Sequence, residues 1–251
     1  MSYAADGIKM DKRKRLVYIL GATGGVGAAL VAYLNQTNTG ELQICCLQRK
    51  DVNSDEKNKI IKYDLLDSDE TELFQWTNDQ VNMFEVMEVV LVLCAGTITP
   101  LVPLTKVEDD ELEKHIAVNL KGQIFLIKRI AVKTNEMKVP LRIIHFDSGA
   151  AYHPIAGWGL YCSAKAYLSM YLHVLNKENP EHKIVLVDPG VIDTKMQADI
   201  RKTPNTIFPD VETFIHYKEN NELKKPEEVA REIAERYIFN WTATNIKERL
   251  L

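Results

Sequence analysis

The sequence predicts an α/β fold in which one doubly wound parallel sheet is flanked by helices. Short apolar runs alternate with helical patterns along the chain, an order typical of parallel β-α-β units. The apolar runs are rich in Val, Ile and Leu and almost continuous in hydrophobicity, as in strands that are buried on both faces. A chain of 251 residues without an internal repeat or a Gly/Ser-rich linker is expected to form a single domain.

The elements are expected in the following order. Six apolar runs predict strands at 16–20, 42–47, 60–63, 89–93, 141–146 and 183–187. Helical patterns cover 26–34, 70–78, 108–134 and 160–176, and a last helix opens at Pro226 and reaches Phe239. Residues 1–14 precede the first strand and are expected to be a flexible extension. The polar stretch 195–225, which contains Pro204 and Pro209, predicts an irregular excursion or a lid.

Composition and charge narrow the functional classes. Hydrophobic residues make up 46% and charged residues 26% of the chain, as in ordinary globular proteins, and the formal net charge is −4. No basic excess favours nucleic acid as a partner. No run of about 18 apolar residues and no secretory pattern is present, so we expect no membrane partner and residence in the cytoplasm. Four cysteines without CxxC spacing and six histidines without paired spacing predict neither a disulfide framework nor a metal site.

A glycine-rich turn joins the first predicted strand to the first predicted helix. Four of the seven residues from Gly21 to Gly27 are glycine. Glycine permits a tight turn, lets the backbone approach a phosphate, and lets the helix pack closely on the strand. The N-terminus of a helix also attracts an anion. The turn therefore predicts the phosphate site of a Rossmann fold, formed by Gly21, Thr23, Gly24, Gly25, Val26 and Gly27.

Further motifs follow the other predicted strands. They are Asp64-Leu65 after the third strand, Cys94-Ala95-Gly96 after the fourth, Val118-Asn119-Leu120, Ser148 after the fifth, Tyr161-x-x-x-Lys165, and Pro189-Gly190-Val191-Ile192-Asp193-Thr194 after the sixth. With the glycine turn, this series resembles the classical short-chain dehydrogenase/reductase family over about residues 15–196. Three positions depart from that family: Leu20 replaces its Thr, Cys94 replaces its Asn, and Asp147 precedes Ser148.

The resemblance implies an NAD(P)-dependent oxidoreductase with a defined set of site residues. The catalytic set that it implies is Asn119, Ser148, Tyr161 and Lys165. Beside the glycine turn, the cofactor contacts that it implies are Asp64, Leu65, Cys94, Ala95, Gly96, Asn119, Tyr161, Lys165, Pro189, Gly190, Val191, Ile192 and Thr194. The long helical patterns at 114–134 and 160–176 correspond to helices that form an interface in this family, so a homodimer or homotetramer is also implied.

The chemistry of these residues suits reduction of a carbonyl. Tyr161 and Lys165 are four apart on one predicted helix and share a face. A free tyrosine has a pKa of about 10, and we expect the Lys165 ammonium to lower it. Ser148 would hold the substrate oxygen near Tyr161, and Asn119 would hold a water that links Lys165 to solvent. Alone, the Tyr161–Lys165 pair would be interpreted as helix packing; the glycine turn and Ser148 favour the catalytic interpretation.

The end of the second predicted strand bears on the choice of cofactor. Arg49 and Lys50 stand there, and cations at this place would bind the 2′-phosphate of NADP. Asp51 leaves NAD open, because an acid near this strand end binds the ribose hydroxyls of NAD. The sequence favours NADP(H) over NAD(H).

The residues around Tyr161 bear on the substrate. The predicted substrate contacts are Ser148, Trp158 and Tyr161. Trp158 would either offer an aromatic wall to a flat substrate or simply pack. Residues 148–161 and 193–197 resemble the subgroup that contains the benzil reductases and sepiapterin reductase. This implies NADPH-dependent reduction of one carbonyl of a small aromatic or α-dicarbonyl compound. Pterin reduction remains an alternative, although the tail 242–251 holds only Glu248 as a carboxylate. A non-catalytic NADP-binding regulatory protein is the other alternative.

Overall fold

A parallel sheet of seven strands forms the centre of the protein. The computed structural model describes residues 13–49, 57–67 and 69–250. The strand order is β3-β2-β1-β4-β5-β6-β7, and every neighbouring pair is parallel. The strands are β1 (Arg13–Leu20), β2 (Leu42–Gln48), β3 (Lys59–Lys62), β4 (Glu85–Leu93), β5 (Leu141–Phe146), β6 (Lys183–Asp188) and β7 (Lys247–Arg249). The predicted doubly wound Rossmann fold is confirmed.

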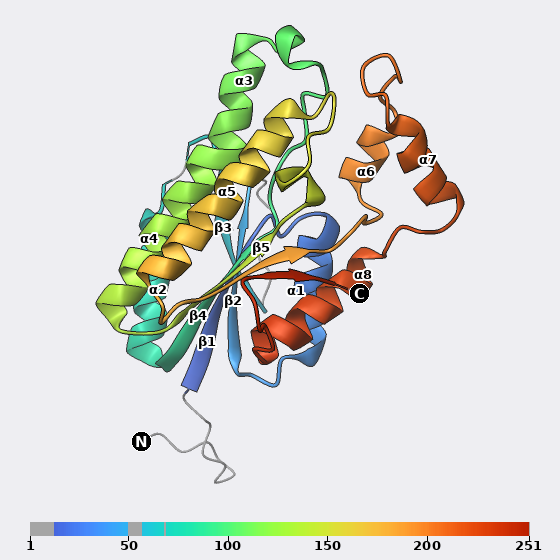
Figure 1. The fold of residues 1–251 in the computed structure, drawn as a ribbon. Coiled ribbons are helices and arrows are strands. Elements are labelled where there is room, and N and C mark those ends of the chain that lie inside the picture. The colour runs from blue at the N-terminus through green and yellow to red at the C-terminus, as the bar shows by residue number, and fades with distance from the viewer. Residues whose placement is uncertain (1–12, 50–56, 68, 251) are drawn as a thin grey trace.

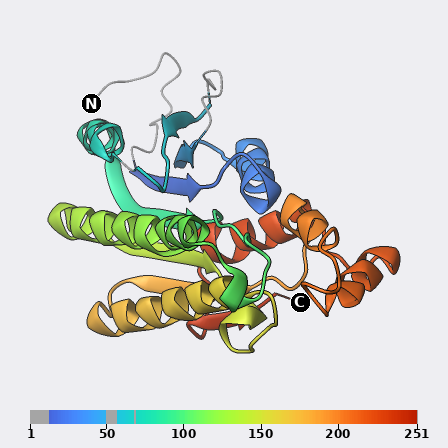
Figure 2. The ribbon, with the colours of Figure 1, turned by 90° about the horizontal axis from the view of Figure 1, so that it is seen from above.

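Helices cover both faces of the sheet (Figures 1 and 2). α1 (Gly25–Thr37) and α8 (Pro226–Ile233), which continues as a π-helical turn Ala234–Phe239, lie on one face. α2 (Thr71–Met83), α4 (Gly122–Met137) and α5 (Gly159–Glu178) lie on the other. Each face buries its own apolar layer: Leu30 and Ile233 pack on the first, and Leu126 and Leu172 on the second. Two buried layers explain why the central strands are apolar on both sides.

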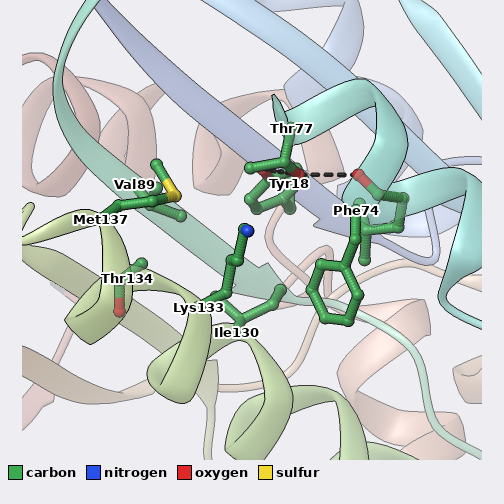
Figure 3. Close-up of a pocket in the computed structure, with 9 residues that line it drawn as sticks. Tyr18, Phe74, Thr77, Val89, Ile130, Lys133, Thr134 and Met137 are labelled. Atoms are coloured by element: carbon green, nitrogen blue, oxygen red, sulfur yellow. Dashed lines mark hydrogen bonds between the residues drawn. The ribbon is translucent and has the colours of Figure 1, made fainter. Parts of the chain in front are cut away.

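The packing between α2 and α4 is shown in Figure 3. The hydroxyl of Tyr18 in β1 lies 2.8 Å from the Thr77 hydroxyl of α2, and Ile130 and Met137 of α4 close the same small cavity. The Thr77 hydroxyl donates in turn to the carbonyl of Leu73. The lining contains none of the predicted site residues. This cavity therefore belongs to the packing of helices on the sheet.

The predicted 108–134 helix is interrupted by a short segment of wider winding. α3 (Asp109–Ile116) passes through a π-helical turn, Ala117–Lys121, into α4. Asn119 lies at the centre of this turn. Such turns occur frequently at functional sites, because the extra residue in the turn redirects neighbouring groups.

Two predictions about the chain outside the main elements need correction, and one strand was not predicted. β1 begins at Arg13, so residues 13 and 14 belong to the sheet; the remainder of the predicted extension, residues 1–12, lies outside the described residues. The stretch 195–225 contains two helices, α6 (Lys195–Ile200) and α7 (Val211–Glu219), which pack around the fully buried Phe208. β7 was not predicted at all, since its sequence Lys-Glu-Arg has no apolar run.

Candidate active site

The predicted site residues gather at one edge of the sheet. β1, β4, β5 and β6 end at Leu20, Leu93, Phe146 and Asp188, and since these strands are parallel, the segments that follow them emerge side by side. The direction of chain winding reverses between β1 and β4. Open α/β sheets bind their ligands at this kind of switch point, beyond the carboxyl ends of the strands.

The glycine turn leads into a helix N-terminus that no side chain caps. Gly24 precedes α1 without a side-chain cap, and the first turn of α1 contains no acidic residue. Gly21 and Gly25 have φ angles of 87° and 51°, which L side chains rarely adopt. A Cβ atom on Gly27 would lie 2.2 Å from the Gly21 carbonyl oxygen. The turn thus requires glycine, and its free N–H groups fit the pyrophosphate of a dinucleotide.

Two further predicted segments close around this turn. A Cβ atom on Gly21 would lie 2.9 Å from the Ala95 nitrogen, and one on Gly25 would lie 3.3 Å from Cγ2 of Thr194. A Cβ atom on Gly27 would meet Cβ of Cys94 at 3.3 Å. The structure therefore brings together the turn, the segment after β4 and the segment after β6. The last of these also contains Pro189, Gly190 (φ 75°), Val191 and Ile192.

Three predicted cofactor contacts lie on the β2–β3 side of the same edge. Arg49 directly follows β2 and is exposed, and Asp64 and Leu65 follow β3. A carboxylate oxygen of Asp64 accepts a hydrogen bond from the Leu66 N–H at 3.0 Å, which fixes this turn. The carbonyl of Leu65 lies against Gly122, where a Cβ atom would approach it to 2.5 Å. Lys50 and Asp51, which were also considered for cofactor choice, lie outside the described residues.

Ser148, Tyr161 and Lys165 lie together where α5 passes the end of β5. The Tyr161 hydroxyl is hydrogen-bonded to the Ser148 side chain. The Lys165 ammonium donates to the carbonyl of Phe146 at 2.5 Å and lies 5.7 Å from the centre of the Tyr161 ring. Ser148 is itself held by the Ala150 N–H, which donates to its Oγ at 3.2 Å. A proton donor, a hydroxyl that can orient an oxygen, and a cation therefore share one corner.

The pKa of Tyr161 differs from the sequence-based expectation. Burial raises the pKa of Tyr161 to about 12, and the Ser148 hydrogen bond offsets this only in part. Burial also lowers the pKa of Lys165 to about 8. The expected lowering of the tyrosine pKa by Lys165 is therefore wrong for the protein chain alone. The physical reason is that Lys165 is directed at a backbone carbonyl, while loss of water around the phenol disfavours the phenolate.

Asn119 is buried in the π-helical turn and connects it to the segment after β4. Its Oδ1 accepts from the Thr97 N–H at 2.9 Å, and its Nδ2 donates to the Thr97 carbonyl at 2.7 Å. Nδ2 also lies 2.8 Å from Nε2 of the buried His115, whose Nδ1 is 2.9 Å from the Thr99 carbonyl. With Nδ1 protonated, His115 satisfies both contacts. His115 was not singled out in the sequence, although its i,i+4 spacing to Asn119 was a usable signal.

Trp158 lies inside an aromatic cluster beneath α7. Trp158 is 5% exposed; its ring stacks on Phe208 with centroids 5.2 Å apart and forms an edge-to-face pair with Tyr161 at 5.8 Å. Phe214 of α7 completes the cluster at 5.3 Å. The indole N–H has no hydrogen-bond partner among the described residues. Packing thus accounts for most of the Trp158 surface, while its contact with Tyr161 keeps it next to the predicted chemistry.

The fold and this site define a nucleotide-dependent oxidoreductase. A glycine turn at a helix N-terminus provides the phosphate site, and a tyrosine, serine and lysine lie at the neighbouring strand end. Within the described part of the chain, no group of three His, Cys, Asp or Glu side chains is arranged to hold a metal ion. Among the same residues, no helix combines the length and apolar character needed to cross a membrane.

Comparisons with known proteins give the family. The sequence profile of the short chain dehydrogenases matches residues 15–205. Benzil reductase ((S)-benzoin forming) of Bacillus cereus is 32% identical over 230 residues, which cover 87% of this chain and 92% of that protein. The enzyme of the same name from Bacillus subtilis (strain 168) is 28% identical over 221 residues, with 86% and 90% covered. The chain belongs to the short-chain dehydrogenase/reductase family and is an NAD(P)-dependent oxidoreductase.

Solved structures agree with this assignment at the level of the fold. The crystal structure of the KRED1-Pglu enzyme superposes with a TM-score of 0.80 at 22% sequence identity, covering 94% of this chain and 100% of that chain. Identity at this level shows a shared fold and no more. The match does extend past the profile, over nearly the whole chain.

Proposed function

We propose that the protein is an NADPH-dependent carbonyl reductase that delivers a hydride to one carbonyl of an aromatic or α-dicarbonyl compound. The observation that carries this proposal is the cluster of Ser148, Tyr161 and Lys165 beside the glycine turn. The two Bacillus relatives, whose names specify formation of (S)-benzoin from benzil, support the substrate class.

Each residue of the cluster has a distinct role in this proposal. NADPH, when bound, supplies the hydride. Ser148 donates to the substrate carbonyl oxygen and keeps it within reach of Tyr161. Tyr161, whose raised pKa keeps it protonated at neutral pH, gives its proton to that oxygen as the general acid. Lys165, whose pKa of about 8 leaves it mostly charged at pH 7, holds its positive charge 5.7 Å from the centre of the Tyr161 ring.

Asn119 is proposed to act through the π-helical turn and to hold a water that restores the proton. Both N–H groups of its side-chain amide and one acceptor site of Oδ1 are used in contacts to Thr97 and His115. The water would therefore bind at the backbone of the turn. We assign the cofactor contacts as the resemblance implies them, with the glycine turn on the pyrophosphate and residues 189–194 beside the nicotinamide.

Selection of NADP is assigned to Arg49. Its position directly after β2, exposed at the edge where the ribose of the adenosine half would lie, supports a contact to a 2′-phosphate. The acid that would favour NAD, Asp51, lies outside the described residues.

The buried aromatic cluster around Trp158 packs against the Tyr161 ring and makes this side of the proposed site apolar. A neighbouring carbonyl withdraws electrons, so one carbonyl of a diketone accepts a hydride more readily than a simple ketone does. A pterin would need a carboxylate to bind its amino groups. Glu248 in the C-terminal tail is instead used within the fold, where it accepts from Tyr237 at 2.7 Å and from Arg236 at 2.5 Å.

A substrate panel tests this function. NADPH oxidation is measured with benzil, phenylpropanedione, sepiapterin and a 3-oxoacyl thioester, and the products are identified. We expect both diketones to be reduced at a single carbonyl and to outrun the other two compounds in kcat/KM. Preference for the thioester, or reduction of both carbonyls of benzil, would contradict the proposal. Tight NADPH binding with no turnover of any compound would favour the regulatory alternative.

We also propose that the protein is a cytoplasmic homo-oligomer. All four cysteines are free thiols, which suits a reducing compartment. Phe125 and Val132 of α4, together with Tyr167, Met170 and Val174 of α5, are large apolar side chains that remain exposed on neighbouring helices. A second copy of the chain would cover them.

A further inference from the structure

Asp147 occupies a buried position between β5 and Ser148 of the proposed site. It follows β5 immediately, precedes Ser148, and is 4% exposed. Its N–H donates to the Val187 carbonyl at 2.8 Å, which fixes the backbone between β5 and β6. One carboxylate oxygen accepts from the Tyr152 hydroxyl at 2.8 Å. The other has no hydrogen-bond partner among the described residues. Buried polar atoms are nearly always hydrogen-bonded, so a buried carboxylate with one oxygen unpaired among the described residues is unusual.

Three polar side chains on one face of α5 connect that helix to the end of β5. Tyr161, Lys165 and Ser169 are each four residues apart, so they form one stripe. Tyr161 is hydrogen-bonded to Ser148, and Lys165 donates to the Phe146 carbonyl. Ser169, 4% exposed, lies 2.7 Å from the Tyr152 hydroxyl. Because that hydroxyl donates its single proton to Asp147, Ser169 must be the donor in the second contact. Ser169, the third residue of the stripe, therefore holds Asp147 in place through the Tyr152 hydroxyl.

The charges around Asp147 come from several elements. Lys165 and Tyr161 face it from α5, and its negative charge raises the pKa of both groups. The Lys247 ammonium of β7 lies 3.2 Å from the centre of the Tyr152 ring. The remaining titratable groups near this corner are Asp188 at the end of β6, Cys94 after β4, Cys162 of α5 and His145 of β5. The sequence already marked Asp147 as a departure from the family pattern.

We propose that Asp147 is a positioning residue whose negative charge favours the phenol of Tyr161 and the ammonium of Lys165, the forms from which the proposed site gives its proton in carbonyl reduction. The idea rests on the proposed function, in which Tyr161 protonates the substrate oxygen. Alcohol oxidation needs the opposite form, a Tyr161 phenolate that can accept a proton. The equilibrium constant of the reaction does not depend on the enzyme. Asp147 changes only the pH ranges over which each direction runs.

The test is the pH profile of kcat/KM in both directions for the best diketone and its alcohol product. Asp147→Asn removes the charge and keeps the shape. We expect the alkaline limit of reduction to move down by about one pH unit or more, the size of effect that a nearby charge has on a buried group. Asp147→Glu, which restores a charge, should move the limit back toward wild type.

Two controls separate charge from structure. Tyr152→Phe removes the hydrogen bond to Asp147 and leaves the carboxylate, so its profile should keep the wild-type limit even if the rate falls. Glu212→Gln removes an exposed charge from α7 and should change nothing. Identical shifts in Asp147→Asn and Tyr152→Phe, or unshifted profiles in Asp147→Asn, would overturn the proposal. Asp147→Ser provides a second neutral variant should the Asn variant fail to fold.

A titration without substrate distinguishes failure of this idea from failure of the proposed function. The near-ultraviolet absorbance of tyrosinate is followed against pH for each Asp147 variant, and the curve of the same protein with Tyr161→Phe is subtracted. The difference reports ionisation of Tyr161 alone. We expect phenolate to form at lower pH in Asp147→Asn than in the otherwise wild-type chain. Coincident difference curves would refute the role of Asp147 whether or not any diketone is turned over.

Discussion

Tyr161 is the residue on which the proposed chemistry depends most directly. Replacing it by Phe keeps the ring, its packing against Trp158 and the fold, and removes only the proton. We expect kcat to fall by about 10²-fold or more, the size of a general-acid contribution, with NADPH affinity retained. Steady-state rates and a fluorescence titration with NADPH measure the two effects. A variant with near-normal kcat would exclude Tyr161 as the donor.

The ionisation of Lys165 predicts how reduction responds to pH. Its pKa is lowered to about 8, so the ammonium is present below that pH and is lost as the pH rises through it. Tyr161 stays protonated over the same range, since its pKa is raised to about 12. We therefore expect kcat/KM for NADPH, which reports groups of the free enzyme, to decline above about pH 8. A profile that is flat well beyond this pH would show that the Lys165 charge is not needed.

Arg49 carries the prediction about cofactor choice. Arg49→Asp should weaken NADPH binding by about 2–3 kcal/mol, the cost of losing a charge-assisted contact, and leave NADH affinity unchanged or improved. Arg231→Asp, which inverts an exposed charge on α8, is the matched control. Dissociation constants of NADPH and NADH, measured for both variants and the wild-type protein, test this prediction. Equal losses for NADPH and NADH would assign Arg49 to the surface instead.

At the scale of the elements, the glycine turn predicts different effects of an alanine substitution at Gly24 and at Gly27. A Cβ atom on Gly27 would lie 2.2 Å from a backbone oxygen, whereas one on Gly24 would have nothing within 4 Å. Gly27→Ala should therefore displace the start of α1, lower stability by about 1–3 kcal/mol and weaken NADPH binding. Gly24→Ala should fold with wild-type stability. Thermal unfolding and NADPH titration of the pair test this; equal behaviour would mean that the turn is not tightly closed.

The elements also show what a sequence can and cannot predict. The strands β1 to β6 are predictable from their almost continuous apolar runs, and helices α1, α2, α5 and α8 from their helical patterns. β7 consists of three polar residues and exists because it pairs with β6, as in the Leu250 N–H donation to Asp188. α6 is only six residues long and is stabilised by tertiary packing around Phe208. The π-helical turn at Asn119 likewise depends on contacts to Thr97 that no local pattern encodes.

The same reasoning applies to the site. Motif order placed the glycine turn, Ser148, Tyr161 and Lys165 at one strand edge, and the structure brings them together. The pKa of Tyr161 was not predictable, because it depends on burial and on the direction of the Lys165 side chain. Tyr152 and His115 were missed for a related reason. The Tyr152 hydroxyl reaches Asp147 only because of the three-dimensional fold. His115 contacts Asn119 across one turn of helix.

At the scale of the whole molecule, the exposed apolar residues of α4 and α5 predict assembly. Met170 is 65% exposed within this group, and Met83, on α2 and outside it, is 62% exposed. Met170→Glu should weaken or abolish the oligomer, since a buried unpaired charge is costly, whereas Met83→Glu should leave it intact. Analytical ultracentrifugation over a range of concentrations reads out the masses. A Met170→Glu protein with wild-type mass would place the interface elsewhere.

The central claim, reduction of a diketone with Tyr161 as proton donor, is tested most directly by one isotope-transfer measurement. The enzyme is mixed with benzil and NADPH that carries deuterium at the transferable position, in a single turnover, and the product is analysed by mass spectrometry and NMR. We predict benzoin with one deuterium, on the carbinol carbon, formed by the wild-type protein and at least about 10²-fold more slowly by Tyr161→Phe. Benzoin without deuterium, or equal rates for the two proteins, would contradict the account.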